Sequence, residues 1–138
     1  MSRPWNLLLL AWLIATAATL GALFLGEVMG MTPCVLCWYQ RIFMFPLAIV
    51  LGIAAYLDDR HGALYALWLA LGGLTIAGYH TLLVAGLIPK AWVPCSAGVS
   101  CADQKLEILN GVQIPWLSLA AFTALTLLLI VYLKKSSR

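Results

Sequence analysis

Four long apolar segments, separated by short polar stretches, dominate the pattern of the chain. A helix that crosses a bilayer needs about 20 apolar residues. In lipid, only a helix satisfies every backbone polar group within a single segment. We therefore predict an all-α integral membrane protein, a four-transmembrane-helix bundle in one domain (residues 1–138) whose helices span about 5–26, 38–57, 63–87 and 114–133.

The first apolar segment could instead be a cleaved signal peptide. Its 23 uncharged positions lie between Arg3 and Glu27, whereas the apolar part of a signal peptide has about 7–15 residues. The segment ends in LGALFLGE, which contains no clear small-x-small cleavage site. A retained transmembrane helix is the favoured interpretation.

Composition excludes several other classes of protein. Of the 138 residues, 64% are hydrophobic and 9% are charged, whereas a soluble domain is about 45–50% apolar and about 25% charged. A small soluble globule could not bury so much apolar surface, and a disordered chain would not contain it. The net charge of +3 comes from scattered side chains. Because they form no basic stripe, we expect membrane lipid and not nucleic acid around this chain.

The distribution of basic residues predicts the orientation in the membrane. Four crossings put both chain ends on one side, together with the polar turn 58–62. Lys and Arg are enriched in cytoplasmic segments, so the side with more of them is expected to be cytoplasmic. The side with the chain ends carries five basic residues and the other side three: Arg3, Arg60, Lys134, Lys135 and Arg138 against Lys90, Lys105 and Arg41 at the membrane edge.

Cys34 and Cys37 form a C-x-x-C motif in TPCVLCWYQR, where the second helix is expected to begin. The free N–H groups and the dipole of a helix N-terminus favour a thiolate there, and a thiolate is the reactive species in disulfide exchange. So short a loop gains little stability from a disulfide, which favours a redox role. The alternative is half of a zinc site, which we consider less favoured because the other cysteine pair has an untypically wide spacing.

Cys95 and Cys101 lie in VPCSAGVSCAD, in the other predicted exoplasmic loop. The small residues between them make a flexible segment that could open and close a disulfide, or simply hold one as a structural link. Beside a reactive C-x-x-C, exchange between the two pairs is the favoured interpretation, and an exoplasmic compartment permits it. Residues 102–111 that follow have the spacing of a short helix on the membrane surface, or form a solvated loop.

Arg41 and His80 are the candidate residues inside the membrane. Arg41 follows Cys37 by four residues, so both lie on one face of the helix, one turn apart. A buried cation there could stabilise the thiolate or a negatively charged acceptor in the lipid, or it could reach the lipid headgroups. A single histidine in the outer half of a helix is more often packed and hydrogen-bonded than catalytic.

On these residues the chain resembles the disulfide bond formation protein B (DsbB) family, including its shorter Gram-positive relatives. The resemblance covers nearly the whole chain. It rests on the cysteine pair of the second loop and on three motifs: PCVLCWYQRIFMFPL from Pro33, GYHTLL from Gly78 and IPWLSLAAF from Ile114. The sequence departs from longer enterobacterial members by Gln40, where an acidic residue often stands, and by the short spacing of the second cysteine pair.

The resemblance implies a thiol:quinone oxidoreductase of the bacterial inner membrane, with both termini cytoplasmic and the cysteine loops outside. Such a protein reoxidises a DsbA-like protein, a soluble thioredoxin-fold dithiol oxidase. It passes the two electrons to a membrane quinone, either ubiquinone or menaquinone.

The resemblance also implies roles for individual residues. Cys95 would be attacked by the partner's thiolate, after which Cys101 would exchange with Cys34. Cys37 would face the quinone ring. Arg41 and His80 would lie near the quinone head group.

Two other functions use the same residues. A vitamin K epoxide reductase-like protein has similar helices, cysteines and quinone, but its C-x-x-C follows the loop pair, whereas here it comes first. A small membrane scaffold would use all four cysteines as structural disulfides. That hypothesis leaves Arg41 and the position of the C-x-x-C unexplained.

Overall fold

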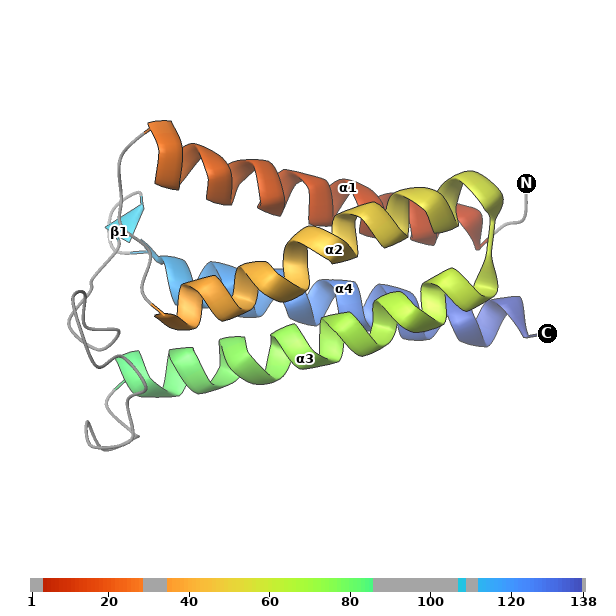
Figure 1. Cartoon of the computed structure of the whole chain (residues 1–138). Helices are drawn as coiled ribbons and strands as arrows, with labels where there is room; N and C mark the ends of the chain where they lie inside the picture. Colours follow the sequence, from red (N-terminus) through yellow and green to blue (C-terminus); the bar gives the residue numbers. More distant parts are fainter. Residues whose placement is uncertain (1–3, 29–34, 86–106, 109–111, 138) are drawn as a thin grey trace.

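The described part of the chain forms an antiparallel bundle of four long helices (Figure 1). This computed structural model describes residues 4–28, 35–85, 107–108 and 112–137. Both termini and the turn between the second and third helices lie at one end of the bundle (Figure 1). In chain order the elements are α1 (Trp5–Leu23), the π-helical turn η1 (Phe24–Val28), α2 (Val35–Leu57), α3 (Arg60–Val84), β1 (Glu107–Ile108), β2 (Val112–Gln113) and α4 (Ile114–Ser136).

The predicted fold class is confirmed. Among the described residues, four helices are long and apolar enough to cross a membrane. Only 17% to 33% of the residues in their most apolar windows are buried in the bundle, so most side chains are left to contact lipid. Large apolar side chains are accordingly exposed along the outside, including Leu20, Ile49, Tyr56, Trp68 and Leu127.

The core between the helices consists mainly of alanine and leucine. Small side chains let transmembrane helices approach closely and gain van der Waals contact. Leu8, Ala11 and Ala15 of α1 are fully buried in this core. The other helices contribute buried residues of the same kinds, among them Leu47, Leu51, Ala63, Ala66, Ala70, Leu125 and Leu129.

Gly73 marks a close approach between α3 and α4. A Cβ atom at this position would overlap the ring of Phe122 on α4. Phe122 is 1% exposed, so its ring lies in the core of the bundle. The absence of a side chain at Gly73 therefore makes room for a large aromatic residue in the core.

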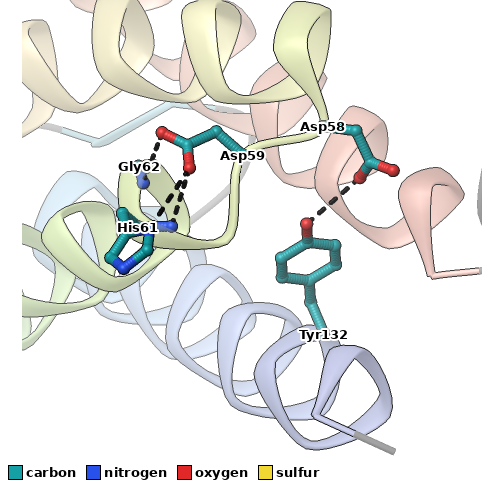
Figure 2. Close-up of polar contacts among 5 residues, drawn as sticks. All are labelled: Asp58, Asp59, His61, Gly62 and Tyr132. Atoms are coloured by element: carbon teal, nitrogen blue, oxygen red, sulfur yellow. Dashed lines mark hydrogen bonds and ion pairs between the residues drawn. The ribbon is translucent and has the colours of Figure 1, made fainter.

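The third helix begins at Arg60, three residues before the predicted start near residue 63, because Asp59 caps it (Figure 2). The Asp59 carboxylate accepts hydrogen bonds from the backbone N–H groups of His61 and Gly62, at 3.0 and 3.1 Å. These are donors that have no partner within the helix. The cap lets α3 start directly after the polar turn.

Asp58 and Tyr132 connect this turn to α4 (Figure 2). The Tyr132 hydroxyl donates to the Asp58 carboxylate at 3.1 Å. Asp58 has a φ of 49°, in the left-handed region that reverses the chain between α2 and α3. The contact joins segments 74 residues apart and closes the end of the bundle that holds the termini.

The expectation of a surface helix within 102–111 is wrong for the residues that the structure describes. Glu107 and Ile108 form a strand that pairs antiparallel with Val112 and Gln113. The sequence between the strands contains Asn-Gly, which favours hairpin connections.

Candidate active site

The N-terminal end of α2 carries the candidate site, at the end of the bundle opposite the chain termini (Figure 1). Helix α2 begins at Val35, directly after Cys34, so Cys37 lies in its first turn. The first N–H groups of a helix lack partners within it and favour negative charge nearby. Cys34, Cys95, Cys101 and the thiol of Cys37 lie outside the part of the chain that the structure describes.

Arg41 is held by contacts to α1 and to its own helix. Its Nη2 donates to the carbonyl oxygen of Ala22 at 2.9 Å. Its guanidinium carbon lies 5.2 Å from the centre of the Trp38 ring, within the range of a cation–π contact. Together these contacts define where the positive charge sits, one helical turn from Cys37.

Gly26 forms part of the surface against which the guanidinium packs. It belongs to η1, the π-helical turn that extends α1. A Cβ atom at Gly26 would lie 3.0 Å from Nη2 of Arg41. The missing side chain therefore gives Arg41 the space to reach the Ala22 carbonyl.

Gln40 and His80 form a buried polar pair between α2 and α3. Nε2 of Gln40 lies 2.9 Å from Nδ1 of His80. The two residues are 6% and 3% exposed, so their polar atoms depend on protein partners. His80 is therefore packed and hydrogen-bonded, as a single histidine at this position usually is.

Helical spacing connects this pair to the cysteine motif. Gln40 and Arg41 follow Cys37 by three and four residues, so all three positions share one face of α2. At this face, Gln40 contacts His80 of α3. Arg41 contacts Ala22, near the C-terminal end of α1. Three helices thus meet beside the start of α2.

Sequence reasoning missed some of these contacts. Gln40 was identified only as a departure from related sequences, and Trp38 and Gly26 were not identified as site residues. The signal available for Gln40 was its three-residue spacing from Cys37. For Gly26 the sequence holds no such signal, because its partner is 15 residues away on another helix.

This geometry defines a class of protein: a multi-pass membrane protein with a C-x-x-C at a helix start, beside a fixed cation and a buried histidine. The chain matches the family model "Disulfide bond formation protein DsbB" over residues 3–132. It therefore belongs to the DsbB family.

Individual relatives agree with this assignment. A "Probable disulfide formation protein" of Metapseudomonas resinovorans is 50% identical over 134 residues, which cover 96% of this chain and 93% of the relative. "Probable disulfide formation protein C 2" of Bacillus anthracis is 40% identical over 122 residues, covering 88% and 86%. "Disulfide bond formation protein C" of Bacillus subtilis is 40% identical over 114 residues, covering 81% of each chain.

Family membership decides between the functions that the sequence left open. It supports an oxidoreductase role in disulfide bond formation. It favours neither the vitamin K epoxide reductase-like alternative nor a purely structural scaffold. The resemblance inferred from the motifs is confirmed.

Proposed function

We propose that the chain is a thiol:quinone oxidoreductase that reoxidises an extracytoplasmic, thioredoxin-fold dithiol protein of the DsbA type. The observation that carries this proposal is the arrangement at the start of α2. Cys37 lies in the first helical turn, and Arg41 is held one turn further on by the Ala22 carbonyl. A cysteine position and a fixed cation one helical turn apart on one helix suit electron transfer to an acceptor that becomes more negative.

The reaction starts with two successive disulfide exchanges. The partner's thiolate attacks Cys95 in a Cys95–Cys101 disulfide and forms a mixed disulfide, and Cys101 leaves as a thiolate. The partner's second thiol then releases Cys95 and leaves the partner oxidised. Two electrons have now moved to the second cysteine pair of this chain.

The same two electrons then pass to the first pair. Cys101 attacks Cys34 of the Cys34–Cys37 disulfide, and Cys95 resolves the mixed disulfide. Cys34 and Cys37 are now both reduced. Their reoxidation delivers two electrons and two protons to an acceptor and restores the starting disulfide.

A membrane quinone, ubiquinone or menaquinone, is the proposed acceptor, and when bound it takes up two electrons and two protons. The residues of the site fit such a head group. The guanidinium of Arg41 has five N–H donors, and one of them is used by Ala22. Arg41 can therefore hold a carbonyl oxygen while it remains anchored to α1. His80, within the same cluster, offers an imidazole buried in the bundle.

A fixed charge at Arg41 also favours the electron transfer itself. A positive charge stabilises an oxygen that gains negative charge more than it stabilises the neutral oxygen, and this difference lowers the barrier. The guanidinium is already anchored by the Ala22 carbonyl. It therefore needs little reorganisation during the reaction.

The proposed location is the inner (cytoplasmic) membrane of a bacterium, with both termini in the cytoplasm. The larger number of basic residues on the side of the chain ends supports this orientation. The start of α2 lies at the opposite end of the bundle (Figure 1). The cysteine pairs would then be exoplasmic, where disulfides persist.

The test is quinone reduction by the purified protein in detergent, with a reduced thioredoxin-fold dithiol protein in excess. We expect Cys34→Ser and Cys37→Ser to stop quinone reduction. We expect Cys95→Ser to stop oxidation of the partner. The unaltered chain without the dithiol protein provides the background rate.

The double variant Cys95→Ser, Cys101→Ser separates this relay from a shorter one. If the protein with both substitutions still oxidises the partner at the normal rate, the second pair is not an intermediate and the relay is wrong. If the rate falls to background while the Cys34–Cys37 disulfide still reacts with a small dithiol, the relay is supported.

A further inference from the structure

Pro46 interrupts the backbone hydrogen bonds of α2. It lies in the interior of this helix, and proline has no backbone N–H. In a regular α-helix, the N–H of residue 46 would donate to the carbonyl oxygen of Ile42. Pro115 differs because it lies in the first turn of α4, where an N–H would have no partner within the helix. Pro46 therefore removes a hydrogen bond, whereas Pro115 does not.

The neighbouring N–H groups do not replace this donor. Helix α2 is α-helical without interruption from Val35 to Leu57, so the N–H groups before and after Pro46 donate to the carbonyls of Arg41 and Phe43. Serine and threonine side chains can satisfy the free carbonyl of a transmembrane helix that contains proline, but α2 contains neither residue. The Ile42 carbonyl is therefore left without a donor from its own helix.

This carbonyl lies on the lipid-facing side of α2. The side chains of Ile42 and Pro46 are both exposed, whereas Met44, Leu47 and Leu51 are buried in the core. A helical carbonyl points toward the residue four positions further on, so the free oxygen lies between two exposed side chains. An acceptor without a partner is costly in hydrocarbon. A membrane molecule that carries a hydroxyl group is therefore the favoured partner.

Arg41 and the Ile42 carbonyl have opposite hydrogen-bonding character. The guanidinium of Arg41 only donates, and it lies 5.2 Å from the Trp38 ring. Trp38 and Ile42 are four residues apart and are 53% and 59% exposed, so the cation and the carbonyl border the same exposed face of α2. The oxygens of a quinone accept hydrogen bonds, whereas the hydroxyl groups of the reduced form, a quinol, also donate. Arg41 therefore suits the oxidised form, and the Ile42 carbonyl suits the reduced form.

We propose that the Ile42 carbonyl, freed by Pro46, accepts a hydrogen bond from a hydroxyl group of the quinol at the lipid-facing surface of α2. This inference deepens the proposed function and rests on it. The thiols of Cys34 and Cys37 form a disulfide and give up two electrons and two protons, which convert both quinone carbonyl oxygens into hydroxyl groups. The Ile42 carbonyl thus binds the product, whereas Arg41 binds the substrate.

Isotope labelling can observe this one carbonyl. Ile42–Phe43 is the only Ile-Phe pair in the chain, so carbonyl-¹³C isoleucine combined with ¹⁵N-phenylalanine gives a single NMR signal that correlates the two residues. The protein is kept reduced in phosphatidylcholine bicelles, and a short-chain ubiquinol is added. We expect a saturable downfield shift of the Ile42 carbonyl signal. The dimethyl ether of the same quinol keeps the ring but cannot donate, so it should cause no such shift.

A lipid headgroup could supply the same hydroxyl chemistry. Phosphatidylglycerol has free hydroxyl groups and phosphatidylcholine has none, so the signal is also recorded in bicelles that contain phosphatidylglycerol without quinol. We expect the Ile42 carbonyl signal at the same position in both lipids. A downfield signal in phosphatidylglycerol that quinol moves no further would refute the proposal in favour of a lipid contact.

Pro46→Ala restores the missing N–H and occupies the Ile42 carbonyl. We expect the carbonyl signal of this variant to lie downfield without quinol and to stay there when quinol is added. The inhibition constant of quinol should rise by about 2- to 10-fold, the range of one hydrogen bond, while KM for quinone stays unchanged. The matched control is Ile49→Ala, because Ile49 is 66% exposed on the same helix and the substitution keeps the N–H. It should leave both constants unchanged.

The combined results separate this inference from the proposed function. If KM and the inhibition constant rise together in Pro46→Ala, the proline acts through the shape of α2 and the proposal is wrong. If quinol inhibits quinone reduction without shifting the Ile42 carbonyl signal, the proposal is wrong while the proposed function stands. If the chain reduces no quinone but quinol shifts the signal, the proposed function fails while the contact at Ile42 stands. The absence of both activity and shift would refute both.

Discussion

Replacing Gly73 by alanine tests how closely α3 and α4 pack. The added methyl group would overlap Phe122, and even the third nearest ring atom, Cδ1, would be 2.6 Å away. Two carbon atoms normally approach to about 3.5–4.0 Å, so the ring or the helix would have to move by about 1 Å. The ring is buried on all sides. We therefore expect a loss of stability.

Overpacking of a core by a methyl group typically costs about 1–3 kcal/mol. Alanine also favours a helix over glycine by up to about 1 kcal/mol, which offsets part of this cost. Gly78→Ala on the same helix provides the matched control, because no heavy atom lies within 4 Å of a Cβ there. Both substitutions gain the same helix preference. The difference between them should therefore be the packing cost alone, about 1–3 kcal/mol.

The assay is reversible unfolding in mixed micelles, with the free energy of unfolding measured for both variants. The combination of Gly73→Ala with Phe122→Leu removes ring atoms at the point of overlap. It should recover part of the loss, with a coupling of about 0.5–3 kcal/mol between neighbouring sites. Equal stability of Gly73→Ala and Gly78→Ala would refute the close approach of α3 and α4 at this position.

Three further predictions concern the candidate site and the orientation. Arg41→Met should lower kcat/KM for quinone by up to about 100-fold. Arg41→Lys should retain only part of the wild-type kcat/KM, because lysine is a point charge without a planar fork. Unchanged kinetics in Arg41→Met would leave Arg41 as a headgroup anchor. Gly26→Ala should displace the guanidinium of Arg41 slightly and lower the rate of quinone reduction by about 2- to 10-fold. Gly21→Ala is the control and should have no effect, because a Cβ there meets no atom within 4 Å. Equal rates in the two variants would contradict the packing of Arg41 against η1. In Ser136→Cys, a maleimide that cannot cross membranes should label the new cysteine only from the cytoplasmic side of the membrane. Labelling from the exoplasmic side would show that the predicted orientation is wrong.

The sequence by itself determined the elements that depend on local composition. Long uncharged runs become transmembrane helices because lipid offers the backbone no other partner. The C-x-x-C could be placed at the start of a helix because the apolar segment begins directly after it, and Cys37 does lie in the first turn of α2. The spacing of Arg41 from Cys37 followed from helical periodicity alone.

The tertiary structure decided what depends on contacts between helices. The partners of Arg41 on α1 and of Gln40 on α3 lie 19 and 40 residues away. Helix periodicity says which positions share a face, but not which residue of a neighbouring helix meets them. That choice depends on the depth and rotation at which helices pack, and small residues such as Gly26 and Gly73 set both by steric fit. The hairpin of β1 and β2 is different, because its strands are close in sequence and the Asn-Gly between them is a local signal for this connection.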